Sequence, residues 1–176
     1  EHQHVLGLSN INLELRNKNI EVIMGLSGSG KSTLIRHINR LIDPTAGSIT
    51  IGGEDIIGMS KEKLRQFRQQ KTAMVFQSFA LLPHKTVMDN VCYGIFLQGV
   101  TGDEAHQRAK RWIDRVGLSG YEDRYPSQLS GGMKQRVGLA RALTCDTEIL
   151  MMDEAFSALD PLIRSDMQDL LLELQK

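Results

Sequence analysis

The most specific chemical feature of the chain is a glycine-rich loop, GLSGSGKST, at residues 25–33. It fits the pattern G-x-x-x-x-G-K-[ST], whose fixed positions are Gly25, Gly30, Lys31 and Ser32. Glycines let backbone N–H groups curl around the outer phosphates of a nucleotide. The Lys31 ammonium adds positive charge, and the Ser32 hydroxyl can bind Mg²⁺. Taken alone, the same stretch is also compatible with a glycine-rich turn that caps a helix.

Two neighbouring acids, Asp153 and Glu154, stand at the end of the apolar run EILMM. Neighbouring parallel strands would place these carboxylates beside the phosphate loop. Asp153 then suits a Mg²⁺ ligand that acts through water, and Glu154 suits the base that orients an attacking water molecule. The alternative is a pair of solvated acids at a strand end.

A second stretch with anion-binding composition is LSGGMKQR at residues 129–136. A serine hydroxyl, exposed backbone N–H groups and the N-terminus of a helix all favour negative charge. The chain therefore encodes two phosphate-compatible sites, and the second, at Ser130, Gly131 and Gly132, needs its own explanation.

Hydrophobic periodicity predicts the elements that position these residues. Strands are expected at residues 5–15, 20–25, 72–77 and 147–155, and a hairpin at 47–56 has Gly52 and Gly53 at its turn. Helices are expected over residues 31–42 and 61–70, through most of 78–138, and from Pro161 onward. The pattern predicts an α/β core interrupted by a helical insertion.

Composition excludes several classes of protein. The 176 residues are 41% hydrophobic, and Lys plus Arg equal Asp plus Glu at 21 each, so the chain has no net basic bias of the kind that nucleic-acid binding favours. We find no signal peptide and no apolar run long enough to span a bilayer, so any membrane crossing is expected from other subunits. Cys92 and Cys145 lack metal-ligand spacing and are expected to be thiols in a reducing compartment.

The order of phosphate loop, LSGG segment and acidic strand end resembles the nucleotide-binding domain of ABC transporters over almost the whole chain. The resemblance implies an α/β P-loop NTPase fold with a RecA-like core, an antiparallel β subdomain and an inserted α-helical subdomain. It assigns residues 1–77 to the core with the β subdomain, 78–138 to the helical subdomain with the LSGG signature, and 139–176 to the return to the core, which is expected to be C-terminally truncated.

The same resemblance implies ATP and Mg²⁺ as cofactors and gives roles to named residues. The ATP contacts implied are Gly25, Leu26, Ser27, Gly28, Ser29, Gly30, Lys31, Ser32, Thr33, Gln77 and Asp153. The metal ligands implied are Ser32, Gln77 and Asp153, and the catalytic residues are Glu154, Gln77 and Lys31. Gln77 matches the glutamine of the Q-loop; alternatively it is a surface residue at a strand end.

The resemblance also explains the second phosphate-compatible site. In ABC ATPases two domains pair head to tail, so that the signature of one covers the nucleotide of the other. Contacts to the partner's ATP are therefore implied for Ser130, Gly131, Gly132 and Asp160, the last in the D-loop SALD at residues 157–160. ATP would hold the dimer together, and hydrolysis would release it.

Further partners follow from the same family. The implied partners are a second ATPase subunit, transmembrane permease subunits and, indirectly, a substrate-binding protein, with no nucleic acid. The apolar residues after Gln77 are expected to meet the permease, although packing inside the helical subdomain is the alternative: Phe79, Leu81, Leu82 and Pro83. The subunit is expected at the cytoplasmic face of the inner or plasma membrane as a peripheral protein.

Three positions depart from the family pattern. The signature reads LSGGM, with Met133 in place of the usual glutamine, and no loss is expected because serine and the glycine backbone contact the phosphates. Gapless counting puts His2 where the family stacks an aromatic ring on adenine, and the alternative is a residue of missing N-terminal sequence. No histidine follows Glu154, although the family carries a switch histidine there, so we expect the sequence to be a fragment that hydrolyses ATP poorly by itself.

Within the family, several stretches are similar to the ATPase subunits of glycine betaine, proline and choline importers, which take up osmoprotectants. They are IMGLSGSGKSTLIRHINRLIDPTAG, MVFQSFALLPHKTVMDNV and MDEAFSALDPLIR. The alternatives are an importer of another small solute, such as an amino acid, and a non-transport ABC ATPase of DNA repair or translation. The absence of sustained heptads between Lys31 and Ser130 disfavours the repair class, and the single visible domain disfavours the translation class.

Overall fold

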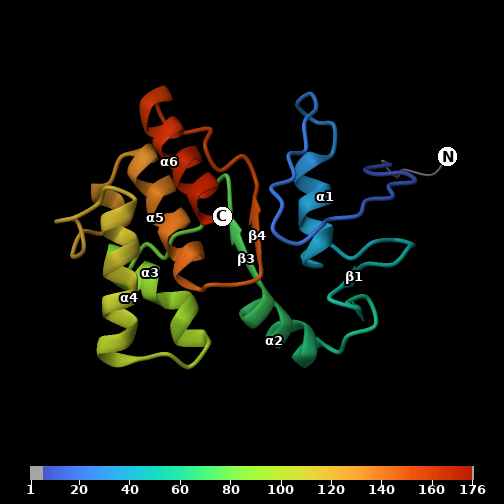
Figure 1. The fold of residues 1–176 in the computed structure, drawn as a ribbon, viewed down its shortest axis with the longest axis horizontal. Helices are drawn as coiled ribbons and strands as arrows, with labels where there is room; N and C mark the ends of the chain where they lie inside the picture. Colours follow the sequence, from blue (N-terminus) through green and yellow to red (C-terminus); the bar gives the residue numbers. More distant parts are fainter. Residues whose placement is uncertain (1–5, 176) are drawn as a thin grey trace. The chain divides into compact units, whose positions relative to one another are not determined.

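The computed structural model describes residues 6–175, and the position of His2 lies outside them. The chain divides into two compact units (Figure 1). The first comprises Glu1–Gly58 and Gln168–Lys176, and the second comprises Met59–Met167. The C-terminal helix α6 (Pro161–Leu174), which was predicted from its proline start, runs across the division.

The first unit contains helix α1 (Lys31–Ile38) and a hairpin of β1 (Thr50–Ile51) and β2 (Glu54–Asp55). The two strands are antiparallel. The turn residues Gly52 and Gly53 have φ values of 58° and 82°, which glycine adopts without steric cost and which a two-residue hairpin turn requires. The predicted hairpin is therefore confirmed, although its strands are short.

Two strand predictions in this unit are wrong: no strand forms in the described part of 5–15 or in 20–25. Alternating apolar residues indicate which face of a strand would be buried, but a strand exists only where another strand pairs with it. The only strand pairs among residues 6–175 are β1 with β2 and β3 with β4, so these stretches have no ladder partner. Their apolar side chains remain exposed, Leu6 to 79% and Val22 to 74%.

Helix α1 is also shorter than the predicted 31–42. It ends at Ile38, and Arg40 adopts the left-handed φ of 53° that stops a helix. The side chain of Asn39 accepts a hydrogen bond from the Leu41 backbone at 3.3 Å, and the Arg40 guanidinium donates to the Ile56 carbonyl at 3.1 Å. These contacts turn the chain where helical periodicity alone would continue it.

The second unit contains the parallel pair β3 (Thr72–Val75) and β4 (Ile149–Met152), with Thr72 opposite Ile149 and Val75 opposite Met152. Helix α2 (Lys61–Lys71) precedes β3 and is capped by Ser60, whose hydroxyl accepts from the Lys63 N–H at 3.2 Å. Both strands and the helix were predicted from the sequence, and their pairing places two distant segments in register.

Three helices pack beside one another in this unit: α3 (Val87–Leu97), α4 (Gly102–Arg115) and α5 (Gly131–Thr144), with a 3-10 turn, η1 (Pro126–Gln128), before α5 (Figure 1). Their shared core is fully buried and includes Val91, Ile95, Ile113 and Val137. The helical insertion is thus confirmed. None of the helices within residues 6–175 is both long and apolar enough to cross a membrane.

Candidate functional site

The phosphate loop lies in the first unit and leads directly into α1. Gly30 precedes the helix with a φ of 92° and, having no side chain, supplies no capping hydrogen bond. The Lys31 ammonium instead reaches back over the loop and donates to the carbonyls of Gly25 at 3.0 Å and Leu26 at 2.9 Å. The helix N-terminus therefore keeps its capacity for an anion, and a lysine stands beside it.

The tip of this loop is open to solvent. Leu26, Ser27, Gly28 and Ser29 are all exposed, and a backbone bond from Ser29 N–H to the Leu26 carbonyl at 3.2 Å holds the turn. A Cβ on Gly25 would lie 2.7 Å from the Ser29 hydroxyl, so a side chain there would push into the loop. A phosphate group could thus approach the backbone here without a blocking side chain.

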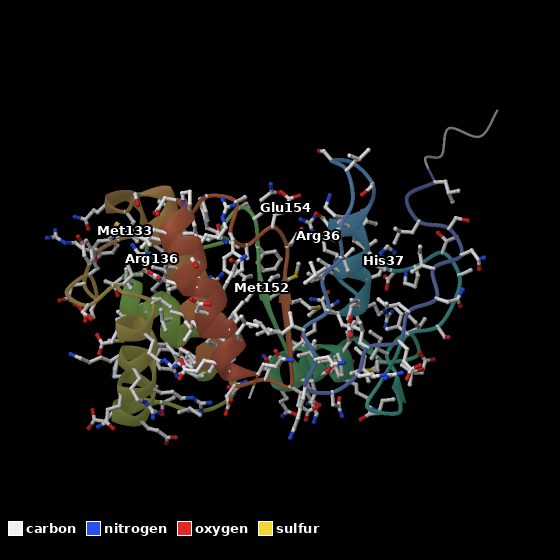
Figure 2. All side chains as sticks on the ribbon, turned by 45° about the horizontal axis from the view of Figure 1, so that its top comes forward. Arg36, His37, Met133, Arg136, Met152 and Glu154 are labelled. Atoms are coloured by element: carbon white, nitrogen blue, oxygen red, sulfur yellow. The ribbon has the colours of Figure 1, made fainter. Side chains whose placement is uncertain are left out.

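In the second unit the structure brings Gln77 and Glu154 together. The Gln77 amide nitrogen donates to the Glu154 carboxylate at 2.9 Å. The strand register explains this contact, because Val75 pairs with Met152 and the two polar residues each come two positions later. Asp153 extends the ladder by donating its N–H to the Val75 carbonyl at 3.0 Å. Figure 2 shows Glu154 just beyond Met152, at the end of β4.

The two acids have opposite environments. The carboxyl group of Asp153 is buried, with 1% of the residue exposed, whereas Glu154 is exposed. Glu154 also has a φ of 49°, a left-handed conformation that non-glycine residues adopt at a cost and that is frequent at functional sites. An exposed carboxylate whose orientation is fixed by a neighbouring amide is suited to hold and deprotonate a water molecule.

Two of the predicted Mg²⁺ ligands, Gln77 and Asp153, follow the paired strands β3 and β4 in the second unit. No group of three or more His, Cys, Asp or Glu side chains within residues 6–175 could hold a metal ion. Mg²⁺ commonly uses one or two protein oxygens together with water and substrate phosphates. The Gln77 amide and the buried Asp153 carboxylate carry oxygens of that kind. The third predicted ligand, Ser32, belongs to α1 in the first unit.

The signature residues form the start of α5. Ser130 is the N-cap: its hydroxyl oxygen accepts from the Met133 N–H at 3.2 Å, and its carbonyl accepts from the Lys134 N–H at 3.0 Å. Gly131 and Gly132 form the first turn. Because the capping bond uses the serine oxygen as an acceptor, the hydroxyl hydrogen stays available to donate to an anion.

Asp160 has a local role that motif matching did not identify. One of its carboxylate oxygens accepts from the backbone N–H groups of Leu162 and Ile163, each at 3.1 Å, and so caps α6. An aspartate before a proline at the first helical position is a recognised sequence signal for such a cap. Its second carboxylate oxygen takes no part in these two bonds.

The four apolar residues after Gln77 divide by exposure: Phe79, Leu81 and Leu82 are half-buried, and Pro83 is exposed. A Cβ built on Gly131 would lie 4.0 Å from the Phe79 ring, so this ring packs beside the start of α5. The fully buried side chain of Asn90 binds both the N–H and the carbonyl of Leu82, at 2.8 and 3.1 Å. No sequence motif indicated the role of Asn90.

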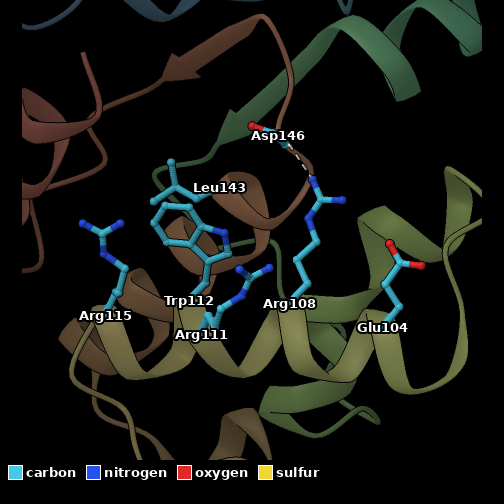
Figure 3. A pocket seen from close by; sticks show the side chains of 7 residues that line it. All are labelled: Glu104, Arg108, Arg111, Trp112, Arg115, Leu143 and Asp146. Atoms are coloured by element: carbon cyan, nitrogen blue, oxygen red, sulfur yellow. Dashed lines mark ion pairs between the residues drawn. The ribbon is translucent and has the colours of Figure 1, made fainter. Parts of the chain in front are cut away.

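A separate hollow of about 380 Å³ lies along α4 and contains none of the predicted site residues. Figure 3 shows its lining side chains, with Arg108 paired to Asp146 at 3.5 Å. The Arg115 guanidinium stands 5.3 Å from the centre of the Trp112 ring, a cation–π contact. Arg108 and Arg115 thus both make contacts within the second unit.

Comparisons with known proteins converge on one family. The ABC transporter family profile matches residues 8–157. The chain is 60% identical, over 96% of its length, to the glycine betaine transport ATP-binding protein OpuAA of Bacillus subtilis. It is 55% identical, over 97% of its length, to the glycine betaine/proline betaine transport system ATP-binding protein ProV of Escherichia coli. The chain spans 40% and 42% of the lengths of these two relatives.

Solved structures agree with the sequence comparison. A bacterial ABC transporter cassette, MJ0796, described as dimeric, superposes with a TM-score of 0.92 at 34% identity, covering 96% of this chain and 75% of the other. A second structure of the same cassette, described as a post-hydrolysis state bound to ADP and Pi, has the same TM-score at 33% identity and covers 97% of this chain and 75% of the other.

Proposed function

The chain belongs to the ABC transporter family, and from that premise we propose that it binds and hydrolyses ATP to drive an importer of glycine betaine or a related osmoprotectant. The observation that carries the hydrolytic part is the hydrogen bond between Gln77 and Glu154. It joins the ends of two paired strands and orients the exposed Glu154 carboxylate through a side-chain amide.

In this proposal ATP binds with its outer phosphates in the loop at 25–33. Binding breaks the bonds of the Lys31 ammonium to the Gly25 and Leu26 carbonyls, and the freed charge contacts the phosphates. The backbone N–H groups at the start of α1 contact them as well. Mg²⁺ would be held by Ser32, Gln77 and Asp153 and would supply charge to neutralise the phosphate oxygens.

Hydrolysis follows from the environment of Glu154. Its carboxylate accepts a proton from a water molecule as the water oxygen forms a bond to the γ-phosphorus. The bond between the γ-phosphorus and the bridging oxygen breaks, and ADP and phosphate leave. Gln77 keeps the carboxylate oriented, and the same amide can bind the attacking water through its carbonyl oxygen.

The signature at the start of α5 serves the nucleotide of a second copy. Support comes from the geometry of Ser130, whose hydroxyl hydrogen remains available for an anion, and from the dimeric structure of the related cassette MJ0796. Closing and opening of the dimer would move permease subunits, which we place against the Phe79–Pro83 segment. The protein would then be peripheral, on the cytoplasmic face of the membrane.

Glycine betaine is favoured as the solute by the names of the relatives that share more than half of their residues with this chain. A methionine importer is the second candidate, because a Staphylococcus haemolyticus methionine import ATP-binding protein is 48% identical over 98% of the chain. Uptake of labelled glycine betaine and of methionine by the complete transporter in proteoliposomes separates the two. Uptake of methionine without uptake of glycine betaine would overturn the choice of solute.

The test of the hydrolytic site is Glu154→Gln in the intact subunit. Loss of the base should lower turnover by roughly 10²–10⁴-fold, the usual contribution of general base catalysis, with ATP affinity retained. Because the nucleotide is no longer cleaved, gel filtration with ATP should show a dimer. Asp166→Asn, at an exposed acid on α6, is the matched control and should leave turnover unchanged. Equal turnover in the two variants would remove Glu154 from the mechanism.

A further inference from the structure

Two consecutive residues after Gln77 have an unusual backbone. Phe79 and Ala80 adopt left-handed φ values of 64° and 47°. This conformation is unfavourable for residues other than glycine, so it persists only where neighbouring contacts hold it. Within the turn itself, backbone bonds run from Phe79 N–H to the Phe76 carbonyl at 3.1 Å and from Ala80 N–H to the Ser78 carbonyl at 2.7 Å.

The side chain that holds this turn from outside is Arg141, near the C-terminal end of α5. Its guanidinium donates to the carbonyl of Ala80 at 2.7 Å and to the carbonyl of Phe79 at 3.0 Å. Its surroundings shield it from water, and this burial lowers the pKa of the guanidinium from its ordinary value. A planar guanidinium that binds two successive carbonyls fixes both the position and the tilt of the turn.

The turn also packs along the rest of α5. A Cβ built on Gly138 would lie 3.7 Å from the Phe79 carbonyl oxygen, and one built on Gly131 would lie 4.0 Å from the Phe79 ring. Phe79 therefore extends from the level of Arg141 to the first turn of the signature helix. One rigid helix thus contacts the turn at one end and presents Ser130 at the other.

The far end of the segment is fixed separately. Asn90, on α3, binds the backbone of Leu82 and also donates to the carbonyls of Lys85 at 3.0 Å and Thr86 at 2.9 Å. The stretch between Gln77 and Leu82 is then short and held at both sides. A change in the φ angles of Phe79 and Ala80 would alter the path of this stretch and so redirect Gln77.

We propose that Arg141 is a positioning residue for ATP hydrolysis: by holding the left-handed Phe79–Ala80 turn against α5, it keeps Gln77 where its amide meets Glu154. The inference rests on the proposed function, since it assigns a role within the same hydrolytic site. It also gives the signature helix a physical link to Gln77, because Arg141 and Ser130 belong to one helix or its cap.

The chain offers a matched control on the same helix. Arg136, labelled in Figure 2, donates to the carbonyls of Val116 and Gly117, both at 2.9 Å, at the C-terminal end of α4. Gly117, like Ala80, has a left-handed φ, of 69°. The two arginines therefore make the same kind of contact, and only Arg141 makes it beside Gln77.

The experiment compares Arg141→Gln and Arg141→Lys with Arg136→Gln in the intact subunit. Turnover, KM for ATP, ATP affinity and melting temperature are measured for each. We expect Arg141→Gln to lower turnover by about tenfold, as for a left-handed turn that has lost the contact that holds it, with KM and affinity within about twofold. Arg141→Lys should fall between, because a single ammonium cannot hold both carbonyls in one plane. Arg136→Gln should lower the melting temperature comparably and keep turnover.

A rescue variant separates positioning from general stability. Ala80→Gly makes the left-handed conformation accessible without help, so adding it to Arg141→Gln should restore turnover several-fold. Equal turnover losses in the two arginine variants, or no recovery with Ala80→Gly, would overturn the inference. If Arg141→Gln does not fold, Arg141→Lys with and without Ala80→Gly gives the same decision. If Glu154→Gln loses turnover while both Arg141 variants keep wild-type turnover, the proposed function stands and only the inference about Arg141 is rejected.

Discussion

Two helices of this protein begin with residues that suit an anion, and they differ in what their glycines do. At the start of α1, Gly30 has a φ of 92°, and a Cβ there would lie 2.9 Å from the Leu8 side chain and 3.0 Å from the Gly7 carbonyl. At the start of α5, Gly131 is helical, and a Cβ would meet nothing closer than 4.0 Å. The backbone conformation and close neighbours of Gly30 therefore require glycine, whereas those of Gly131 do not.

The capping groups differ in the same way. Gly30 offers α1 no side-chain cap, whereas Ser130 caps α5 through its own hydroxyl oxygen. A helix N-terminus without a side-chain cap suits a tightly held phosphate of its own loop. A capped one, with a spare hydroxyl hydrogen and small first residues, suits contact with something outside the chain. This comparison supports the composite site of two subunits, whose trans contacts stay a prediction.

The largest effect is expected from Lys31→Ala. The Lys31 ammonium reaches over the loop, and hydrogen bonds to charged groups contribute about 1.5–3 kcal/mol, so the Kd for MgATP should rise roughly 10- to 100-fold. Calorimetry measures the affinity, and circular dichroism checks the fold. Lys61→Ala, at an exposed lysine of α2, is the control. Unchanged affinity in a folded Lys31→Ala protein would remove α1 from the phosphate site.

A paired substitution tests the comparison between the glycines. Gly30→Ala should lower the free energy of unfolding by about 1–3 kcal/mol, because it forces a side chain into a left-handed residue beside Leu8. Gly131→Ala should keep or raise stability by up to about 1 kcal/mol, since alanine favours helix over glycine. Denaturant unfolding measures both. In the Glu154→Gln background, Gly131→Ala should nevertheless weaken the ATP-dependent dimer, and an undiminished dimer would contradict the trans role.

The smallest loss of stability is expected from Ser130→Ala. Losing an N-cap costs about 1 kcal/mol, and Ser60→Ala should cost the same, because both hydroxyls accept one backbone N–H at 3.2 Å. Only Ser130→Ala should also weaken the ATP-dependent dimer formed by Glu154→Gln, as measured by sedimentation. If both serine variants weaken the dimer equally, the cap explains the whole effect and the signature has no separate role.

Much of the fold could be predicted because its signals are local. Helices α2 and α6 were recognised from their sequence pattern, α6 also from its proline start, whereas their caps at Ser60 and Asp160 were found only in the structure. The hairpin followed from two adjacent glycines. The strands expected at 5–15 and 20–25 were wrong because alternation describes a strand's faces and cannot supply its pairing partner. The domain boundaries and the permease contacts of Phe79, Leu81, Leu82 and Pro83 stay predictions.

The sequence alone determined the chemistry of the site: which residues could bind phosphate, hold Mg²⁺ or accept a proton, and which family the motif order indicates. Only the tertiary structure decided that Gln77 donates to Glu154, which lies 77 positions away, and that Arg141 holds Phe79 and Ala80 in a left-handed turn. The reason is physical. A cap or a glycine turn is fixed by hydrogen bonds between near neighbours, whereas these contacts depend on the register of β3 against β4 and on the packing of α5, to which distant parts of the chain contribute.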